Sequence, residues 1–142
     1  MKRHPALVGL SDDHHHELVQ ARRLLEAAGA DADGRLRAGA SYVDVFFRDT
    51  VEHFRREEET VLPLYARQPS ADAALLERIR REHMELHGLA RALRAEVAAD
   101  DVSIETLEAL GSLLRAHVRL EERELFEDVQ RVVPAAELDR LS

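Results

Sequence analysis

Apolar residues recur at intervals of three and four positions in four separate stretches of the chain. This spacing places them on one side of an α-helix, so each stretch is predicted to form an amphipathic helix. Short breaks rich in Gly, Pro, Asp and Ser separate the stretches. The predicted helices cover residues 12–28, 40–66, 71–98 and 104–132, followed by a short helical tail at 135–141. No segment alternates apolar and polar residues over a useful length, so no strand is expected.

The residues at the ends of these stretches support the predicted limits. Ser11, Ser70 and Ser103 stand where a helix N-cap is expected, and Gly29 stands where the first helix would stop. Helices that are joined by short links pack antiparallel to their neighbours. The chain is therefore predicted to be all-α, with one up-down-up-down four-helix bundle spanning residues 1–142. The one longer connection, from Gly29 to Gly39, has no predicted structure.

Polar pairs interrupt the apolar stripes of three predicted helices at similar depths. The pairs are His53 with Glu57, His83 with His87, and His117 with Glu121. Because the members of each pair are one helical turn apart, both lie on one helix face. An ionised carboxylate that is buried without a partner costs several kcal/mol, so a cation is expected between these helices. Imidazole and carboxylate ligands suit iron, zinc or copper, and helix bundles hold such sites in their cores.

Other interpretations of the pairs need no metal. A single pair such as His117 and Glu121 also fits an exposed helix face, or a buried hydrogen bond. Three pairs at matching depth favour the metal site instead. The segments 53–62 and 117–126 also follow nearly the same pattern of residue types, which indicates two helix pairs built alike.

The first helix contains three consecutive histidines, and two arguments about them disagree. His14 is best centred on the apolar stripe that follows it. Alignment of residues 15–18 with residues 83–86 favours His15 instead, because it makes His15 the counterpart of His83. His15 is the predicted metal ligand, with His14 as the alternate, and His16 is expected to face solvent.

With these residues the chain resembles the hemerythrin-like (HHE cation-binding) family over about residues 10–130. The matching elements, in chain order, are His15, His53-x-x-x-Glu57, His83-x-x-x-His87 and His117-x-x-x-Glu121. The resemblance implies an oxo- or hydroxo-bridged non-haem di-iron centre. One iron would be bound by His83, His87 and His117, and the other by His15 and His53, with both glutamates as bridges. The second iron would keep a position open for O2, NO or peroxide.

The sequence departs from the family pattern at the last ligand. Oxygen-carrying hemerythrins have an aspartate at the fifth position after the last histidine, whereas this chain has Glu121 at the fourth and Glu122 at the fifth. Helical geometry favours Glu121, with Glu122 as the alternate ligand. Asp49, one turn before His53, is a candidate to orient that histidine, and two tyrosines are candidates to flank the pocket. These tyrosines are Tyr42 and Tyr65.

Composition excludes several other classes of function. The net charge is −8, from 28 acidic and 20 basic residues, which disfavours binding to nucleic acid. The absence of cysteine excludes disulfides and thiolate metal sites, and it fits a cytoplasmic location. Neither a signal peptide nor an apolar run long enough to cross a bilayer is found, so no membrane association is expected.

The favoured function is a di-iron protein that binds a small ligand for sensing, scavenging, storage or iron handling. A redox enzyme that reduces peroxide, a zinc or manganese homeostasis module, and an interaction bundle with a polar core are the alternatives. A ferritin-like site is excluded because it needs Glu-x-x-His, and this motif does not occur in the chain. The sequence leaves open the oligomeric state, the metal in the cell, and whether the protein is an enzyme.

Overall fold

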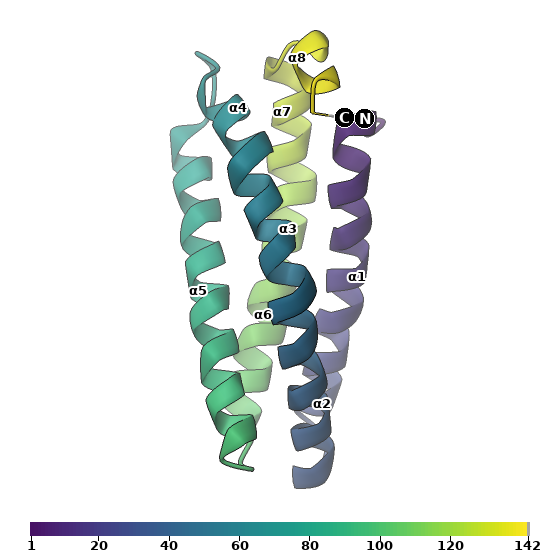
Figure 1. Cartoon of the computed structure of the whole chain (residues 1–142), viewed down its shortest axis with the longest axis vertical. Coiled ribbons are helices and arrows are strands. Elements are labelled where there is room, and N and C mark those ends of the chain that lie inside the picture. Colours follow the sequence, from purple (N-terminus) through teal and green to yellow (C-terminus); the bar gives the residue numbers. More distant parts are fainter. Residues whose placement is uncertain (142) are drawn as a thin grey trace.

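The computed structural model describes residues 1–141 as four long helical rods that lie side by side, with a short helix across one end (Figure 1). Two rods are single helices, and two are continuous helices that contain π-helical turns. The elements are α1 (Pro5–Ala27), α2 (Ala32–Val45), η1 (Phe46–Thr50), α3 (Val51–Arg56), η2 (Glu57–Val61), α4 (Leu62–Ala66), α5 (Ala73–Ala98), α6 (Ile104–Leu120), η3 (Glu121–Leu125), α7 (Phe126–Val132) and α8 (Ala135–Asp139). We refer to residues 32–66 as the α2–α4 rod and to residues 104–132 as the α6–α7 rod.

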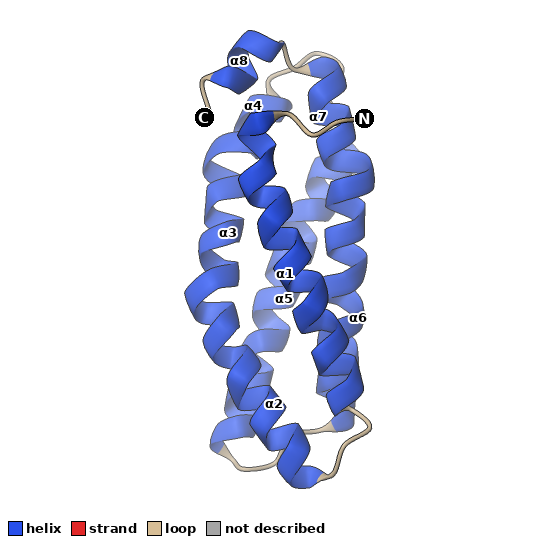
Figure 2. Ribbon diagram, turned by 90° about the vertical axis from the view of Figure 1, so that its right-hand side faces the viewer, coloured by secondary structure: helices blue, strands red, loops and turns tan. Residues whose placement is uncertain are grey.

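Successive rods run in opposite directions, and both ends of the described residues 1–141 lie at the end of the bundle capped by α8 (Figure 1). Figure 2 shows the same arrangement from the side, with helix throughout the rods and loops confined to the two ends. Helix α6 packs against α1 and α5, and α2 also packs against these two helices. Each rod therefore has two neighbours in a closed four-rod arrangement. The predicted all-α antiparallel bundle is confirmed.

The first helix begins earlier than predicted, at Pro5 rather than at position 12. Pro5 suits a first helical turn because its missing N–H would have no partner there. The side chain of His4 caps the helix, with Nδ1 accepting a hydrogen bond from the Ala6 N–H at 3.0 Å. Ser11 is therefore not an N-cap. It lies inside α1, and its hydroxyl donates to Glu122 at 2.8 Å.

The predicted connection from Gly29 to Gly39 is wrong, because α2 begins at Ala32. The Asp31 carboxylate caps this helix by accepting a hydrogen bond from the Gly34 N–H at 2.8 Å. Gly39 lies within α2, where a Cβ atom would come within 3.2 Å of the Leu93 side chain. Glycine at this position therefore allows α2 and α5 to approach closely, which explains why a weak helix former occurs there.

The last two rods begin close to the predicted positions. The cap of α5 is Asp72, whose carboxylate accepts from the Leu75 N–H at 3.0 Å, rather than Ser70. Ser103 caps α6 as expected, accepting from the Thr106 N–H at 3.1 Å. None of the helices among residues 1–141 has the length and hydropathy required to cross a lipid bilayer.

Apolar side chains fill the bundle interior at both ends and leave a polar layer between. The cluster at the α8 end contains Leu7, Leu10, Val61, Leu62, Leu64, Tyr65, Leu75, Leu76, Ile79, Leu120, Leu125, Phe126, Val129, Val133 and Leu138. The cluster at the other end contains Ala21, Leu24, Ala27, Ala28, Tyr42, Phe46, Phe54, Leu86, Ala90, Leu93, Val102, Leu107, Leu110, Leu114 and Val118. Burial of apolar surface in both clusters fixes the rods on either side of the layer.

Two of the three π-helical turns begin in this polar layer. Segment η2 starts at Glu57, and η3 starts at Glu121. A π-turn adds a residue to the helical turn and rotates the helix that follows relative to a regular α-helix, and such turns are frequent at functional sites. Segments η2 and η3 therefore begin at matching positions of the repeated sequence segments 53–62 and 117–126, so the repeat is present in the structure as well as in the sequence.

Candidate metal centre

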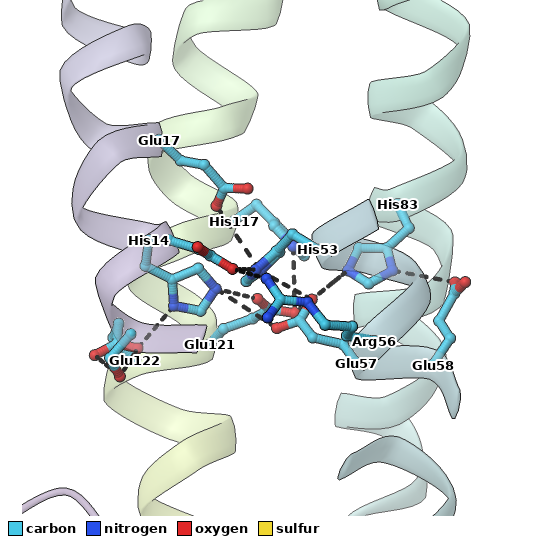
Figure 3. A network of polar contacts seen from close by, with 12 residues as sticks. His14, Glu17, His53, Arg56, Glu57, Glu58, His83, His117, Glu121 and Glu122 are labelled. Atoms are coloured by element: carbon cyan, nitrogen blue, oxygen red, sulfur yellow. Dashed lines mark hydrogen bonds and ion pairs between the residues drawn. The ribbon is translucent and has the colours of Figure 1, made fainter. Parts of the chain in front are cut away.

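The polar layer contains six buried side chains that come from all four rods (Figure 3). These residues are His14 of α1, His53 and Glu57 of the α2–α4 rod, His83 of α5, and His117 and Glu121 of the α6–α7 rod. Each is at most 1 % exposed. They form two overlapping groups of four, in which the potential ligand atoms all lie within 4.8 Å of one another. The first group contains His14 and His53, the second contains His83 and His117, and both contain the two glutamates.

The two glutamates lie between the histidine pairs. The Glu57 carboxylate lies 3.3 Å from Nε2 of His53, 3.3 Å from Nε2 of His83 and 3.5 Å from Nε2 of His14. The Glu121 carboxylate lies 2.7 Å from Nε2 of His14 and 3.3 Å from Nε2 of both His83 and His117. Each carboxylate therefore contacts both histidine pairs, which is the position required of a group that bridges two cations.

The outer nitrogen of each histidine is held by a carboxylate from a neighbouring rod. The Nδ1 atom of His53 lies 3.0 Å from Asp13, and that of His83 lies 3.1 Å from Glu58. The remaining two contacts join Nδ1 of His117 to Glu82 at 2.8 Å, and Nδ1 of His14 to Glu122 at 2.7 Å. A carboxylate that accepts a hydrogen bond from Nδ1–H leaves Nε2 directed at the centre, which is how metal-ligating histidines are oriented.

These contacts form a closed ring around the bundle. In each contact the carboxylate comes from one rod and the histidine from the next. The carboxylate of α1 contacts the histidine of the α2–α4 rod, and the carboxylate of that rod contacts the histidine of α5. The carboxylate of α5 contacts the histidine of the α6–α7 rod, whose own carboxylate contacts the histidine of α1. We call the four carboxylates Asp13, Glu58, Glu82 and Glu122 the carboxylate ring. Sequence reasoning missed it, except that Glu122 was considered as a ligand. A signal was present, since each member directly adjoins His14, Glu57, His83 or Glu121 in the sequence.

The electrostatics of the layer indicate a strong demand for positive charge. Burial by itself would lower the pKa of His53 and His83. Glu57 and Asp13 nevertheless raise the pKa of His53 to about 10, and Glu121 and Glu57 do the same for His83. The pKa of His117 is raised to about 9 in the same way, against the effect of burial. Burial also opposes ionisation of Glu121, yet the surrounding histidines hold its pKa well below the usual value. Protonated imidazoles thus supply the cations that balance the carboxylates.

The layer still contains buried polar atoms without a hydrogen-bond partner. Both oxygens of Glu57 and the Nε2 atoms of His53 and His117 belong to this set. Buried polar atoms are normally paired, so their common direction toward the centre indicates a missing partner. Neutral imidazole nitrogen and carboxylate oxygen are suitable ligands for iron, zinc or manganese. The residues present therefore fit two metal ions.

The structure selects His14 rather than His15 as the histidine that enters the layer. His14 is buried, and its position continues the inward spacing of Leu7, Leu10, Ala21 and Leu24 along α1. His15 is exposed, and so is His16. The prediction of His15 assumed that it occupies the position in α1 that His83 occupies in α5. The true counterpart of His83 in the layer is the preceding residue of α1, His14, so the assumed register is wrong by one position.

The predicted group of His83, His87 and His117 is not formed. His87 is half-buried and lies outside both groups, with its ring 5.3 Å from that of Phe46 and 5.8 Å from that of Phe54. The Phe54 ring stacks on His83 with centroids 4.0 Å apart. His87 thus lies beside two aromatic rings, and burial together with Arg91 lowers its pKa.

The predicted roles of Asp49 and Tyr65 are not supported either. Asp49 is exposed and pairs with Arg48 at 3.0 Å, while Asp13 takes the position beside His53. Tyr65 belongs to the apolar cluster at the α8 end, and its hydroxyl donates a hydrogen bond to Asp128. Tyr42 is fully buried in the opposite cluster, with no hydrogen-bond partner for its hydroxyl among residues 1–141.

Besides the carboxylate ring, sequence reasoning missed another buried charged residue near the layer. Glu17 lies on α1, one turn beyond His14, and is 5 % exposed. Its carboxylate lies 4.0 Å from Nε2 of His53, and burial raises its pKa to about 7. The signal was its i, i+3 spacing from His14, which places both on one helix face. A glutamate after three histidines nevertheless resembles an exposed polar segment.

A cavity of about 400 Å³ lies beside the His53 side of the layer, between α1 and the α2–α4 rod. Its lining includes Glu17, His53, Asp13 and Arg56, and an ion pair joins the last two. The first histidine pair therefore adjoins a space large enough for a small molecule.

A family model for the hemerythrin HHE cation binding domain matches residues 7–129, which include all six residues of the layer. No curated protein and no solved structure gives a match. The family match and the two buried histidine–glutamate groups indicate a metal-binding helical protein. The chain belongs to the hemerythrin HHE cation-binding family.

Proposed function

We propose that the protein is a non-haem di-iron protein that binds a small ligand at an open position of one iron. The observation that carries this proposal is the pair of overlapping groups that share Glu57 and Glu121. Two cations held between the same two carboxylates are expected to lie close together, as in a dinuclear centre. Bound iron would supply a redox-active ion with room for an exogenous ligand.

The protein side chains would provide most of the coordination. Each ion would be held by two Nε2 atoms and by oxygens of the shared glutamates, which leaves positions free in a six-coordinate ion. The carboxylate ring would hold each Nδ1–H by a hydrogen bond, which orients the imidazole so that Nε2 faces the ion. This differs from the three-plus-two histidine division expected from the family resemblance, because His87 lies outside both groups.

The cavity beside His53 supports entry of the small ligand on the His14/His53 side. The lining residues Asp13 and Arg56 make part of the cavity wall polar, which suits peroxide, and the volume of about 400 Å³ also admits O2 or NO. Sensing, scavenging, storage and iron handling are all compatible with such a site. The absence of cysteine leads us to propose a cytoplasmic location, and the net charge of −8 a protein without a nucleic-acid partner.

The main test is metal analysis with absorption spectroscopy of protein purified from iron-rich medium. We expect about two irons per chain and a near-ultraviolet and visible band of the bridged ferric pair. A band that responds reversibly to O2 or NO would identify ligand binding, whereas steady consumption of peroxide would identify a reductase. Full occupancy by zinc or manganese in iron-supplemented cells would contradict the iron assignment and favour a homeostasis module for those metals.

A further inference from the structure

Glu17 is a buried acidic residue for which the chain offers no adequate partner. Both of its carboxylate oxygens are buried and lack a hydrogen-bond partner among residues 1–141. Figure 3 shows its side chain directed from α1 toward the polar layer, on the same side as His14 and His53. Glu17 is not a member of the two groups that share Glu57 and Glu121.

The nearest basic group is already engaged elsewhere. His53 has Nδ1 at 3.0 Å from Asp13 and Nε2 at 3.3 Å from Glu57, while Glu17 is more distant at 4.0 Å. Two arginines line the adjoining cavity, and both are paired: Arg56 with Asp13, and Arg48 with Asp49. An ionised carboxylate without a cation is strongly unfavourable in the interior. The environment of Glu17 therefore calls for a further positive charge in front of it.

A metal ion beside His53 would meet that requirement. Metal–ligand bonds to imidazole nitrogen and carboxylate oxygen are about 2.0–2.2 Å long, so two ligands on opposite sides of one ion lie about 4 Å apart. The separation of 4.0 Å between Nε2 of His53 and Oε2 of Glu17 agrees with this spacing. The ion-pair contact of Glu17 involves His53 and no histidine of the second pair, which limits its reach to one ion.

We propose that Glu17 is a terminal carboxylate ligand of the ion held by His14 and His53. The inference rests on the dinuclear centre proposed above. It makes the two ions inequivalent, because the first has a ligand that contacts it alone and the second has none. Glu17 also lines the cavity beside His53, so a small molecule arriving there meets the ion next to this carboxylate. The first ion is then the more tightly held.

The test is a titration of metal-free protein with Co²⁺, followed by visible absorption and by calorimetry. We expect two binding steps for the wild-type chain, the tighter one at the His14/His53 group. Glu17→Gln should weaken the tighter step at least tenfold and change its absorption band, while the weaker step stays within twofold. Glu26→Gln is the matched control, since Glu26 is an exposed residue of the same helix that pairs only with Arg22 among residues 1–141. It should leave both steps unchanged.

Thermal unfolding separates a ligand from a merely structural carboxylate. Glu17→Gln should raise the Tm of the metal-free protein, because it removes a buried unpaired charge, and should reduce the rise in Tm that Co²⁺ produces. Glu17→Met is a second variant that restores apolar packing and should act in the same way. Wild-type affinity at both steps in the variants, or a lower Tm without metal, would overturn the assignment of Glu17. Absence of any binding step in the wild-type chain would overturn the dinuclear centre as well.

Discussion

The two histidine pairs of the polar layer share the same two glutamates, but their surroundings differ. The His14/His53 pair adjoins a cavity of about 400 Å³ and the buried carboxylate of Glu17. The His83/His117 pair packs against Phe54, whose ring stacks on His83 at 4.0 Å. Ligand type therefore does not distinguish the pairs. Access and additional charge do, and under the proposed function both favour exchange of small molecules at the first pair.

Both pairs share the parts that hold the centre together. Glu57 and Glu121 contact histidines of each pair, and every Nδ1 atom is bound by a member of the carboxylate ring. Changes to these shared parts should affect both pairs, whereas changes to one histidine or one ring member should affect one.

The largest effect is expected from removal of a shared glutamate. Glu57→Ala and Glu121→Ala each delete a ligand that contacts both histidine pairs, so we expect the loss of both metal ions. The metal-dependent rise in Tm should disappear with them, because metal binding adds to folding stability. Elemental analysis after gel filtration measures this, and two ions retained in both variants would show that these glutamates do not bridge.

Removal of one histidine should separate the two halves. We expect His53→Ala and His117→Ala each to retain about one metal ion, at the His83/His117 and His14/His53 group respectively. Azide, a small anionic probe, should perturb the absorption of His117→Ala but not of His53→Ala, because the cavity adjoins His53. The opposite pattern would place the accessible ion on the second pair.

Smaller effects are expected from the carboxylate ring. Asp13→Asn should weaken the ion beside His53, and Glu82→Gln the ion beside His117, each by about 10–100-fold in affinity. Titration of the metal-free variants with Co²⁺ resolves the two steps. Glu85→Gln is the control, because Glu85 is exposed on the same helix as Glu82. Equal weakening of both Co²⁺ binding steps by either variant would show that a ring member affects both histidine pairs and not only the one it contacts.

The pH dependence should be opposite for stability and for metal binding. The pKa values of His53 and His83 are raised to about 10, above the unfolded value of about 6.5. Their contribution to the stability of metal-free protein is therefore complete below pH 6.5 and is lost as the pH rises toward 10. Metal affinity should rise over the same range, with release of about one proton per ligating histidine at neutral pH. Chemical denaturation and calorimetry in two buffers measure the two trends, and a metal-free protein that gains stability from pH 7 to pH 9 would contradict this account.

The smallest effects are expected at the two histidines that lie outside the groups. His15→Ala and His87→Ala should leave the metal content and both Co²⁺ steps unchanged, because neither side chain enters the layer. Loss of an ion from His87→Ala would restore the three-histidine group that the family pattern implies. The same outcome for His15→Ala would return the first-helix ligand to its predicted position.

The sequence predicted the bundle because apolar periodicity and short links act over many residues at once. The layer was visible for the same reason in His53, Glu57, His83, His117 and Glu121, which interrupt apolar stripes at one depth. The choice among three consecutive histidines was not visible, since it depends on the exact rotation of α1 against its neighbours. A difference of one residue changes the direction of a side chain by about 100°.

Other features depend on tertiary contacts that local patterns do not report. The π-turns that begin at Glu57 and Glu121 lie in the polar layer, to which all four rods contribute side chains. His87 has the right spacing from His83, but Phe46 and Phe54 form its surroundings. The partner of His53 was expected one turn away on its own helix and comes instead from α1.

The closed order of the carboxylate ring has a consequence for how the centre can assemble. Every rod contributes a histidine to the layer and a carboxylate that orients the histidine of the next rod. The ring of contacts is therefore complete only when all four rods are in place. A fragment that ends after the α2–α4 rod would carry Asp13 opposite His53, but would lack the histidine that Glu58 holds and the acid that holds His14. Half of this chain is consequently not half of a metal centre, and loading with metal reports that all four helices have docked.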